Sequence, residues 1–502
     1  MTELEFQSIA DEGYNRIPII AETLADLETP LSFYLELTQS EFGGENSFLL
    51  ESVFGGERFG RYSFIGLPAR TLIRTRANVS EVVRDGQVVE KHRGDPFDFI
   101  ESFQNNFKVA QYQITQHIGL LHFCGGLAGY FGYDAVRYVE KNLEHSTPRD
   151  DLGLPDIQLL LTEELAVIDN VTRKIYMITY ADPSHPEAYV NAKERLRELM
   201  NRLHTAVQSS NISASVCTGT YREFKKEDYL DAVRQAKEYV LAGELMQIQI
   251  SQRLTKPYQD NPLSLYRVLR SLNPSPYMYY YNFGNFHIVG ASPEILVRQE
   301  KRGNDRICTI RPLAGTRLRG YTPERDAELA AELLNDPKEL AEHVMLIDLA
   351  RNDIGRIAEI GSVQVTEYMI IEKYSHVQHI VSSIEGRLKS GITNFDVLRA
   401  TFPAGTLSGA PKVRAMELID RLEPIKRGIY GGAVGYLSFS GEMDLAIAIR
   451  TGLIYNGNLY VQAAAGIVAD SIPESEWQET ENKARAVLRA AELVQCGLDG
   501  NF

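Results

Sequence analysis

Two groups of acidic side chains stand at helical spacing in the C-terminal half of the chain. They are Glu476, Glu479 and Lys483 after Pro473, and Glu339, Glu342 and His343 after Pro337. Residues three, four or seven positions apart share one face of a helix. Paired carboxylates offer the few oxygen ligands that Mg²⁺ takes from a protein, leaving coordination positions for an anionic ligand. A solvated, ion-paired helix surface is the simpler alternative.

Other polar residues lie in glycine-rich or strand-end settings: Gln247, Glu294, Thr316, Thr406, Tyr430 and Arg450. The small residues of Gln462–Gly466 let backbone N–H groups approach an anion, although tight strand–helix packing explains them equally well. Neither zinc-site spacing nor a G-x-S-x-G nucleophile motif is present. The pattern indicates a metal-assisted site for a small anionic substrate and leaves the reaction open.

Composition excludes several classes of protein. The 502 residues carry a net charge of −15, so a nucleic acid or an anionic membrane surface is disfavoured as a partner. The four scattered cysteines are too few for a disulfide framework, and no signal-peptide pattern or membrane-spanning run is seen. We therefore expect a cytoplasmic protein.

The elements that must position these residues favour an antiparallel α+β fold. Helices are expected at 186–203, from Tyr229 to Gly243 and after Pro473. Alternation in 246–251 predicts a strand with Gln247 and Gln249 on one face. Asn456-Gly457 between the runs 446–455 and 459–468 predicts a hairpin.

The polar stretch near residue 208 divides the chain. We predict an N-terminal region at 1–205, a linker at 206–221 and a C-terminal region at 222–502. A short echo links Gly125–Tyr130 with Gly431–Tyr436, which suggests that the two regions share a substructure.

Ordered motifs over nearly the whole chain resemble the chorismate-utilising enzymes, most closely the large subunits of anthranilate synthases. The motifs lie at 49–52, 273–278, 290–294, 311–317, 341–353 and 402–412. The resemblance implies a large β-sandwich of antiparallel sheets flanked by helices. It also implies a Mg²⁺-dependent lyase that converts chorismate and ammonia to anthranilate and pyruvate in tryptophan biosynthesis. No glutaminase motif is seen, so ammonia would come from a separate glutamine amidotransferase subunit.

The resemblance also implies roles for individual residues. The metal ligands would be Glu342 and Glu479, with Glu476 behind them. Substrate would be bound by Gly315, Thr316, Tyr430, Arg450, Ala464, Ala465, Gly466 and Lys483. The catalytic residues would be Glu294 as general acid, Thr406 near the leaving oxygen, His379 in the second step and Gln247. His379 has a core role as its alternative.

Two positions distinguish this chain from related enzymes. Gln247 stands where water-adding relatives carry a lysine base, and Ala314 stands where many aminodeoxychorismate synthases carry a nucleophilic lysine. An aminodeoxychorismate or aminodeoxyisochorismate synthase is the alternative function, and a silent tryptophan-binding subunit is a further one.

The resemblance implies a separate allosteric site as well. Ser52 and Pro276, Tyr277 and Met278 match the tryptophan feedback site of the family. An ordinary strand end is the alternative for the segment that ends at Ser52.

Overall fold

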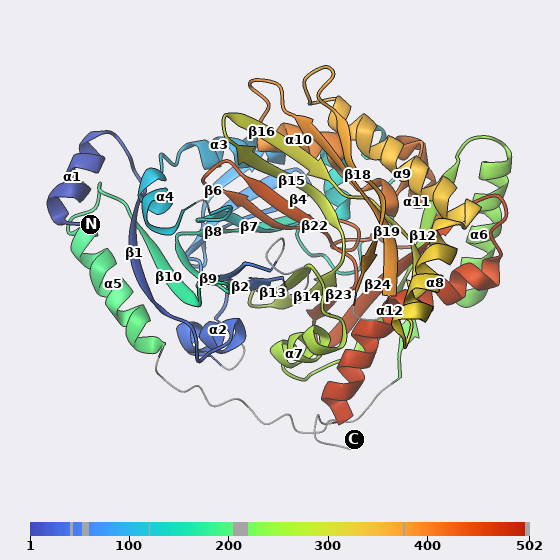
Figure 1. Ribbon diagram of the computed structural model, residues 1–502, viewed down its shortest axis with the longest axis horizontal. Coiled ribbons are helices and arrows are strands. Elements are labelled where there is room, and N and C mark those ends of the chain that lie inside the picture. The colour runs from blue at the N-terminus through green and yellow to red at the C-terminus, as the bar shows by residue number, and fades with distance from the viewer. Residues whose placement is uncertain (41–43, 53–59, 120, 204–218, 375–376, 497–502) are drawn as a thin grey trace.

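Two large antiparallel sheets form the centre of the molecule (Figure 1). The computed structural model describes residues 1–40, 44–52, 60–119, 121–203, 219–374 and 377–496. Within these described residues each sheet has 12 strands. All of the strand pairs within them are antiparallel, as the hairpin and alternation patterns predict.

The first sheet has the order β1(Ile17–Leu24), β10(Lys174–Ala181), β9(Glu164–Asp169), β3(Tyr62–Gly66), β2(Ser47–Glu51), β13(Tyr277–Asn282), β14(Phe286–Ser292), β23(Thr451–Tyr455), β24(Asn458–Ile467), β12(Gln247–Pro257) and β11(Tyr221–Arg222), with β20(Gly409–Ala410) paired to β12. The second has the order β17(Leu313–Leu318), β19(Val377–Arg387), β16(Asp305–Ile310), β15(Ile295–Arg302), β22(Met443–Ile447), β21(Ala433–Ser438), β7(Gly126–Phe131), β8(Ile157–Thr162), β4(Thr71–Arg76), β5(Val79–Arg84) and β6(Gln87–Arg93), with β18(Gln364–Lys373) paired to β19.

Helices cover the outer faces of both sheets. They are α1(Glu3–Asp11), α2(Pro30–Thr38), α3(Pro96–Asn105), α4(Tyr112–Ile118), α5(Ala188–Arg202), α6(Lys226–Leu241), α7(Pro262–Leu272), α8(Pro323–Leu334), α9(Pro337–Gly355), α10(Asn394–Thr401), α11(Lys412–Leu422) and α12(Pro473–Cys496). One apolar core lies between the sheets and joins residues such as Phe64 and Leu165 of the first to Ala128 and Tyr436 of the second. Separate cores lie under the helices on either side. The expected sandwich of sheets with flanking helices is confirmed.

Strands from both halves of the chain build each sheet. In the first sheet β2 pairs with β13, and in the second β7 pairs with β21. The predicted linker at 206–221 lies mostly outside the described residues, although its last residue, Tyr221, pairs with Thr255 of β12. The division into two regions stays a prediction, but the two regions share both sheets.

The short glycine echo corresponds to two strands that pair with each other. β7 and β21 run antiparallel with Gly129 opposite Gly435. A side chain at either glycine would collide with the backbone of the next strand in the sheet. Glycine therefore serves close strand packing at both positions.

The predicted hairpin at Asn456-Gly457 is confirmed, because Tyr455 pairs directly with Asn458 and both turn residues have positive φ. The strand-like run 446–455, however, is two strands in different sheets. Residues 448–450 break the run between β22 and β23, and Arg450 has a φ of 50°. This break separates the two sheets at a position that proves to be part of the site.

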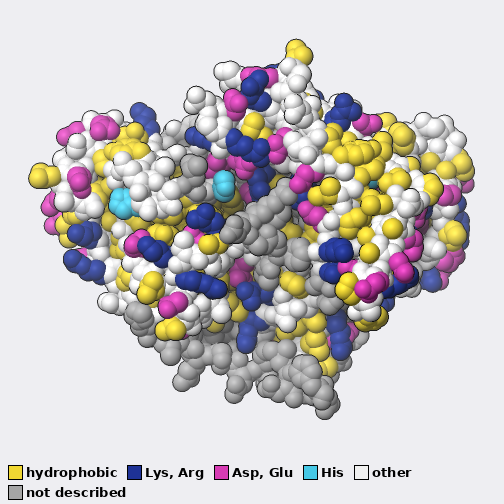
Figure 2. Space-filling view, viewed as in Figure 1, with side chains coloured by type: hydrophobic (Ala, Val, Ile, Leu, Met, Phe, Trp, Pro, Cys, Tyr) yellow, Lys and Arg dark blue, Asp and Glu magenta, His cyan; other side chains and the backbone are white. Residues whose placement is uncertain are grey.

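The surface shows no single charged region in the view of Figure 2, where basic and acidic side chains are interspersed. Hydrophobic side chains gather over α8 and α9, and Leu318, Tyr321, Val344 and Tyr368 are among the exposed ones. Among the helices that the structure describes, none is long and apolar enough to cross a bilayer.

Candidate active site

Helices α9 and α12 carry the acidic groups that the sequence singles out. α9 begins at Pro337 after Asp336, whose side chain accepts the Lys338 backbone N–H at 3.1 Å. Glu342 is half-buried and the Glu479 side chain is 45 % exposed. Glu476, by contrast, is buried. Both helices therefore bring a partly accessible carboxylate to the same end of the sheets.

A glutamine side chain forms a hydrogen bond with Glu342 of α9. Gln247 begins β12, is buried, and donates from Nε2 to Glu342 Oε1 at 3.0 Å. Its amide also lies against Gly466 of the neighbouring strand, where a Cβ would stand 2.5 Å from Gln247 Nε2. Glu342 is thereby fixed to the strand pair β12–β24.

A lysine connects the α12 carboxylate to the same strand pair. Lys483 Nζ contacts Glu479 Oε1 at 2.6 Å and donates to the Ala464 carbonyl at 2.9 Å. Glu342 and Glu479, which are 137 positions apart in the sequence, are thus both linked to residues 464–466 of β24.

The carboxylates fit a divalent cation that takes few protein ligands. Burial raises the pKa of Glu339, and the neighbouring Glu342 charge adds to this shift. Burial likewise raises the pKa of Glu476, with a further contribution from Glu479. A cation at Glu342 and Glu479 would relieve this crowding of negative charge. In the described part of the chain no group of three or more acidic, histidine or cysteine side chains is close enough for a complete protein cage. Two carboxylates suit Mg²⁺, which takes few oxygen ligands from a protein and keeps positions for water or substrate.

Backbone N–H groups of β24 face the same space. Gln249 and Ser251 direct their own N–H groups to Ser408 and Glu423, away from β24, at 2.9 and 2.8 Å. Their cross-strand partners Gly466 and Ala464 must therefore point away from β12. Beyond Val461, β24 no longer pairs with β23, so no hydrogen-bonded strand lies on the side of β24 that faces away from β12. Ala464 and Gly466 thus offer their N–H groups to a ligand, whereas Ala465 between them points to β12.

Arg450 supplies a half-buried positive charge at the break between the sheets. Its backbone φ of 50° costs about 1–3 kcal/mol for a residue with a side chain and persists only where the surroundings enforce it. Burial lowers the pKa of its guanidinium, which also interacts with Tyr374 and Glu294. Among the described residues no carboxylate lies within 4 Å of it. The guanidinium is therefore available to an anionic ligand.

Tyr430 lies next to these groups. Burial raises the pKa of its hydroxyl, so the group remains neutral, and it contacts the Ala464 backbone. Together with Arg450 and the two backbone N–H groups, Tyr430 gives the pocket a set of neutral and cationic contacts for a carboxylate.

Glu294 is a buried carboxyl at the junction of β14 and β15. It is 6 % exposed, and burial raises its pKa to about 8. Contacts with Thr406 and with the Leu313 backbone, and the charges of Lys483 and Arg450, lower this pKa in part. Glu294 and Thr406 line one cavity. At neutral pH Glu294 therefore carries a proton and can act as a general acid.

His379 is a neutral base in a defined tautomer. Its Nδ1 lies 2.8 Å from the Gly315 carbonyl, so Nδ1 must carry the hydrogen, and the Thr316 hydroxyl lies 3.1 Å from the same nitrogen. Burial, followed by the Arg450 charge, lowers the pKa of the ring to about 4. Nε2 is buried and makes no hydrogen bond within the described structure. An unpaired basic nitrogen next to Arg450 favours a proton acceptor over a core residue.

The position that accepts the hydrogen bond from His379 requires a glycine, Gly315. Its φ is 65°, and a Cβ there would lie 2.8 Å from Leu333 and 3.1 Å from Glu339 Oε2. The glycine lets β17 approach α9, so Thr316 and the Gly315 carbonyl can both reach His379.

The first prediction concerns the effect of a side chain at Gly466 on the Gln247–Glu342 hydrogen bond. Substitution by alanine should push Gln247 out of reach of Glu342, because the new Cβ would lie 2.5 Å from Gln247 Nε2 and 2.9 Å from Gln249 Nε2. We expect a crystal structure of Gly466→Ala without the Gln247–Glu342 hydrogen bond and a loss of about 1–3 kcal/mol in the free energy of unfolding. Gly355→Ala is the control, because a Cβ there meets no atom within 4 Å. An intact hydrogen bond in Gly466→Ala would contradict the prediction.

The residues assigned to feedback inhibition lie together in a separate cavity. Ser52, Pro276, Tyr277 and Met278 line it at the point where β2 ends and β13 begins. Its other walls are aromatic, from Tyr62, Phe64 and Tyr436, and charged, from Glu51, Arg298 and Asp444, of which Arg298 and Asp444 form an ion pair at 2.7 Å. Apolar and aromatic walls with a few charged groups suit an aromatic amino acid.

Sequence reasoning missed two residues of the site. Tyr374 packs edge-on against His379 at 5.4 Å and interacts with Arg450, and no motif pointed to it. Gln249 places its amide beside Gln247 over Gly466. Strand alternation signalled the position of Gln249, although it gave no role for it.

The chain is similar to known proteins over most of its length. Residues 61–489 match the profile of the chorismate binding enzyme family. The chain is 55% identical to anthranilate synthase component 1 of Neisseria meningitidis serogroup B, over 99% of this chain and 100% of that one. It is 52% identical to anthranilate synthase component 1 of Pseudomonas aeruginosa, over 99% of both chains. Among solved structures, anthranilate synthase component I from Streptococcus pneumoniae is 38% identical with a TM-score of 0.74, covering 87% of this chain and 94% of that one.

Proposed function

Because the chain belongs to the family of chorismate-binding enzymes, we propose that it is the large subunit of an anthranilate synthase. It converts chorismate and ammonia to anthranilate, pyruvate and water. The carrying observation is that Glu294 is protonated and His379 neutral near pH 7, and that both interact with the charge of the half-buried Arg450. The full-length relatives support this function over the aminodeoxychorismate alternatives.

Chorismate is a dianion, and the pocket offers matching groups at two places. Arg450, Tyr430 and the N–H groups of Ala464 and Gly466 bind the enolpyruvyl carboxylate. On the other side of the pocket Glu342 and Glu479 would hold Mg²⁺, which would supply positive charge for the ring carboxylate. Lys483 fixes Glu479 against β24 and adds positive charge.

The first step is addition of ammonia at C2 with loss of the C4 hydroxyl. Glu294 gives its proton to the departing oxygen, which leaves as water, and Thr406 orients that oxygen. Ammonia forms the C–N bond with its lone pair and needs no base to become a nucleophile. A neutral amide at Gln247 and a methyl group at Ala314 are consistent with direct attack, because neither can activate water or form a covalent adduct.

The second step is loss of the C2 proton and departure of pyruvate. His379 takes the proton on Nε2, the nitrogen that is left free by the bond between Nδ1 and Gly315. The C–O bond to the enolpyruvyl group then breaks, the ring becomes aromatic, and the released fragment is protonated to pyruvate.

A separate glutamine amidotransferase supplies ammonia, as component 2 of the enzyme. Tryptophan binds the cavity at Ser52 and Pro276–Met278 and inhibits allosterically, because that cavity is distinct from the catalytic pocket. The enzyme acts in tryptophan biosynthesis in the cytoplasm.

The function is tested by incubating the purified chain with chorismate, Mg²⁺ and ammonium salt at alkaline pH. Anthranilate fluorescence is the expected result. Isochorismate or 4-amino-4-deoxychorismate as the product would refute the assignment, and accumulation of aminodeoxyisochorismate would contradict the role of His379.

The two shifted pKa values predict the pH dependence of kcat. Glu294 must be protonated, so kcat at saturating chorismate and free ammonia should fall as the pH rises through about 8. His379 must be neutral, so the acidic limb should lie near pH 4. A kcat that keeps rising above pH 9 with free ammonia held constant would contradict the role of Glu294.

Ser52→Leu should relieve tryptophan inhibition. A larger side chain at the end of β2 fills the cavity, so we expect the tryptophan concentration for half-inhibition to rise at least about 10-fold, equivalent to about 1.4 kcal/mol of lost binding. Turnover without tryptophan is the internal control and should change little. Unchanged inhibition would exclude Ser52 from the regulatory site.

A further inference from the structure

Tyr374 borders both His379 and Arg450, and no step of the proposed reaction uses it. The tyrosine directly follows β18 and is 6 % exposed. Its backbone is fixed at both polar groups, because its N–H donates to the Val377 carbonyl at 2.8 Å and its carbonyl accepts from Arg319 Nη1 at 2.6 Å. A fixed backbone therefore carries the ring next to the reacting groups.

The hydroxyl group of Tyr374 is held by a largely buried ion pair. It donates to Glu372 Oε2 at 3.0 Å, and the other oxygen of Glu372 accepts from Arg311 Nη2 at 2.6 Å. Arg311 also binds Glu367 at 3.0 Å, so its charge is shared between two carboxylates. Burial, followed by the Glu372 charge, raises the pKa of the Tyr374 hydroxyl, which stays a neutral donor. Both ends of the side chain are thus fixed.

The ring of Tyr374 packs against the imidazole of His379. Their centroids are 5.4 Å apart and their planes are inclined at 68°, an edge-to-face contact. Strand pairing explains this contact, since Glu372 of β18 stands directly opposite His379 of β19 and Tyr374 is two positions beyond Glu372. Side chains two positions apart share one face of a strand, which places both on the side of the histidine.

The contact with Tyr374 restricts a torsion that the hydrogen bond to Gly315 leaves soft. The χ2 angle of a histidine is broad, because it joins an sp³ carbon to an sp² carbon. The bond from Nδ1 to the Gly315 carbonyl, at 2.8 Å, fixes one edge of the ring. Nε2 on the other edge makes no hydrogen bond within the described structure, so only packing orients it. The Tyr374 ring therefore helps to set where Nε2 lies.

Tyr374 is also compatible with the free charge of Arg450. The tyrosine is neutral, so it interacts with the guanidinium without forming an ion pair. Its hydroxyl partner, Glu372, is bound to Arg311 instead. A carboxylate in the place of the tyrosine would pair with Arg450 and compete with an anionic substrate.

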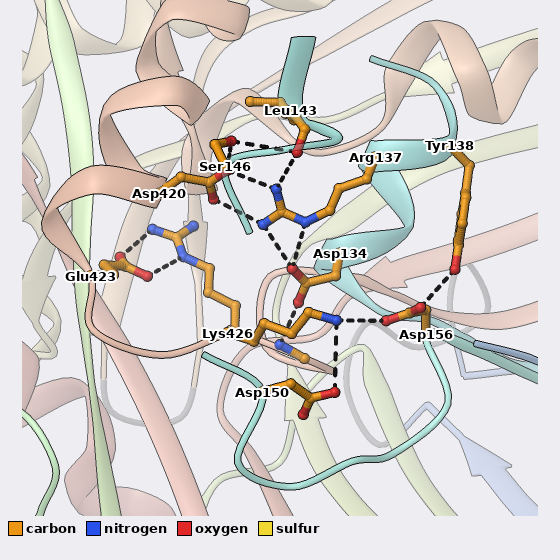
Figure 3. A network of polar contacts seen from close by, with 12 residues as sticks. Asp134, Arg137, Tyr138, Leu143, Ser146, Asp150, Asp156, Asp420, Glu423 and Lys426 are labelled. Carbon is orange, nitrogen blue, oxygen red and sulfur yellow. Dashed lines mark hydrogen bonds and ion pairs between the residues drawn. The ribbon is translucent and has the colours of Figure 1, made fainter. Parts of the chain in front are cut away.

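A second tyrosine has the same kind of polar environment without a catalytic neighbour (Figure 3). Tyr138 is half-buried and donates to Asp156 Oδ2 at 2.6 Å, while Lys426 contacts Oδ1 of the same carboxylate at 3.3 Å. None of the catalytic or substrate-binding residues named above is labelled in this network. Tyr138 is therefore a matched control for Tyr374, because both donate to a carboxylate that a cation holds, and only Tyr374 contacts the histidine.

We propose that Tyr374 is a positioning residue for the second step, whose ring holds His379 so that Nε2 can accept the C2 proton. The inference rests on the proposed function. Tyr374 neither binds the substrate nor exchanges a proton in this role. The first step does not use His379, so it should depend little on Tyr374. Loss of the ring should therefore slow the second step selectively and release aminodeoxyisochorismate, the product of the first step.

Tyr374→Leu tests the proposal, with Tyr138→Leu as the control. Each variant is incubated with chorismate, Mg²⁺ and ammonium salt at alkaline pH, and chorismate, aminodeoxyisochorismate and anthranilate are quantified by liquid chromatography. Tyr374→Leu should lower the ratio of anthranilate to aminodeoxyisochorismate at least about 10-fold, because small displacements of a reacting group are costly. Chorismate consumption should stay within about threefold of the unmodified rate, since the addition step does not need His379. Tyr138→Leu should leave the ratio unchanged.

Two further variants separate positioning from a general loss of packing. Tyr374→Phe keeps the ring and loses only the hydroxyl, so its ratio should stay within about threefold of the unmodified one. Tyr374→Met replaces Tyr374→Leu if the latter does not fold, because an unbranched side chain fills irregular space, and the same fall is expected.

An unchanged ratio in folded Tyr374→Leu or Tyr374→Met overturns the proposal. An equal fall in Tyr138→Leu or in Tyr374→Phe also overturns it, because the ring beside His379 would then not be the cause. Failure of the unmodified chain to form anthranilate would instead refute the proposed function.

Discussion

Glu479→Gln is expected to lower kcat/KM for chorismate at least about 100-fold, equivalent to about 2.7 kcal/mol of transition-state stabilisation. The substitution keeps the size of the side chain and removes the charge that faces the cation. It also removes the contact to Lys483 at 2.6 Å, so the lysine is no longer held at Glu479. Isothermal titration with MgCl₂ in the presence of chorismate should show a matching loss of Mg²⁺ affinity.

Glu474→Gln is the matched control, since Glu474 is exposed in the first turn of the same helix. It should retain both Mg²⁺ affinity and turnover. Glu479→Gln should still bind tryptophan, because the cavity at Ser52 contains no residue of α12. Equal Mg²⁺ affinity in Glu479→Gln and the unmodified chain would remove Glu479 from the metal site.

Glu294→Gln is expected to lower kcat about 10²–10⁴-fold, the usual contribution of a positioned general acid. Glutamine preserves the shape of the side chain but has no proton to give to the leaving oxygen. The KM for chorismate should change little, since the substrate contacts that we propose are made by Arg450 and the β24 backbone. Single-turnover measurements should place the loss in the addition step. A kcat within a few-fold of the unmodified value would exclude Glu294 as the acid.

The stability of the same variant gives an independent readout. The pKa of Glu294 is raised from 4.5 to about 8, so the unmodified chain loses stability as the pH rises from 4.5 to about 8, where the unfolded carboxyl is ionised and the buried one is not. Glu294→Gln lacks this ionisation. Relative to the unmodified chain, its Tm should therefore rise as the pH increases from 4.5 to about 8 and should be higher at pH 9. Equal Tm values at pH 9 would indicate that the carboxyl is not buried in solution.

Much of the local structure follows from the sequence, because it depends on neighbouring residues. The helix that begins at Pro473, the alternation along β12 and the hairpin at Asn456-Gly457 all appear as predicted. The β-rich run 446–455 contributes to the hairpin only from Thr451, because it is divided between the two sheets at Arg450 although its β-propensity is continuous. Its backbone conformation there is enforced by tertiary contacts, which propensity does not record.

The sequence by itself determined which residue types were available. These are the helical carboxylates Glu342 and Glu479, a histidine in an apolar run (His379), a glutamine at the position of a lysine base in related enzymes (Gln247), and small residues at 464–466. Only the tertiary structure decided their states. Near pH 7 Glu294 is protonated and His379 is neutral because burial penalises charge on each. Gln247 reaches Glu342, and Arg253 lies beside Gln462, because strand register brings distant residues into contact. The spacing of residues along the sequence determines which side chains share one face of a helix or strand. The protonation state and the hydrogen-bond partners of those side chains depend on the residues that the fold packs against that face.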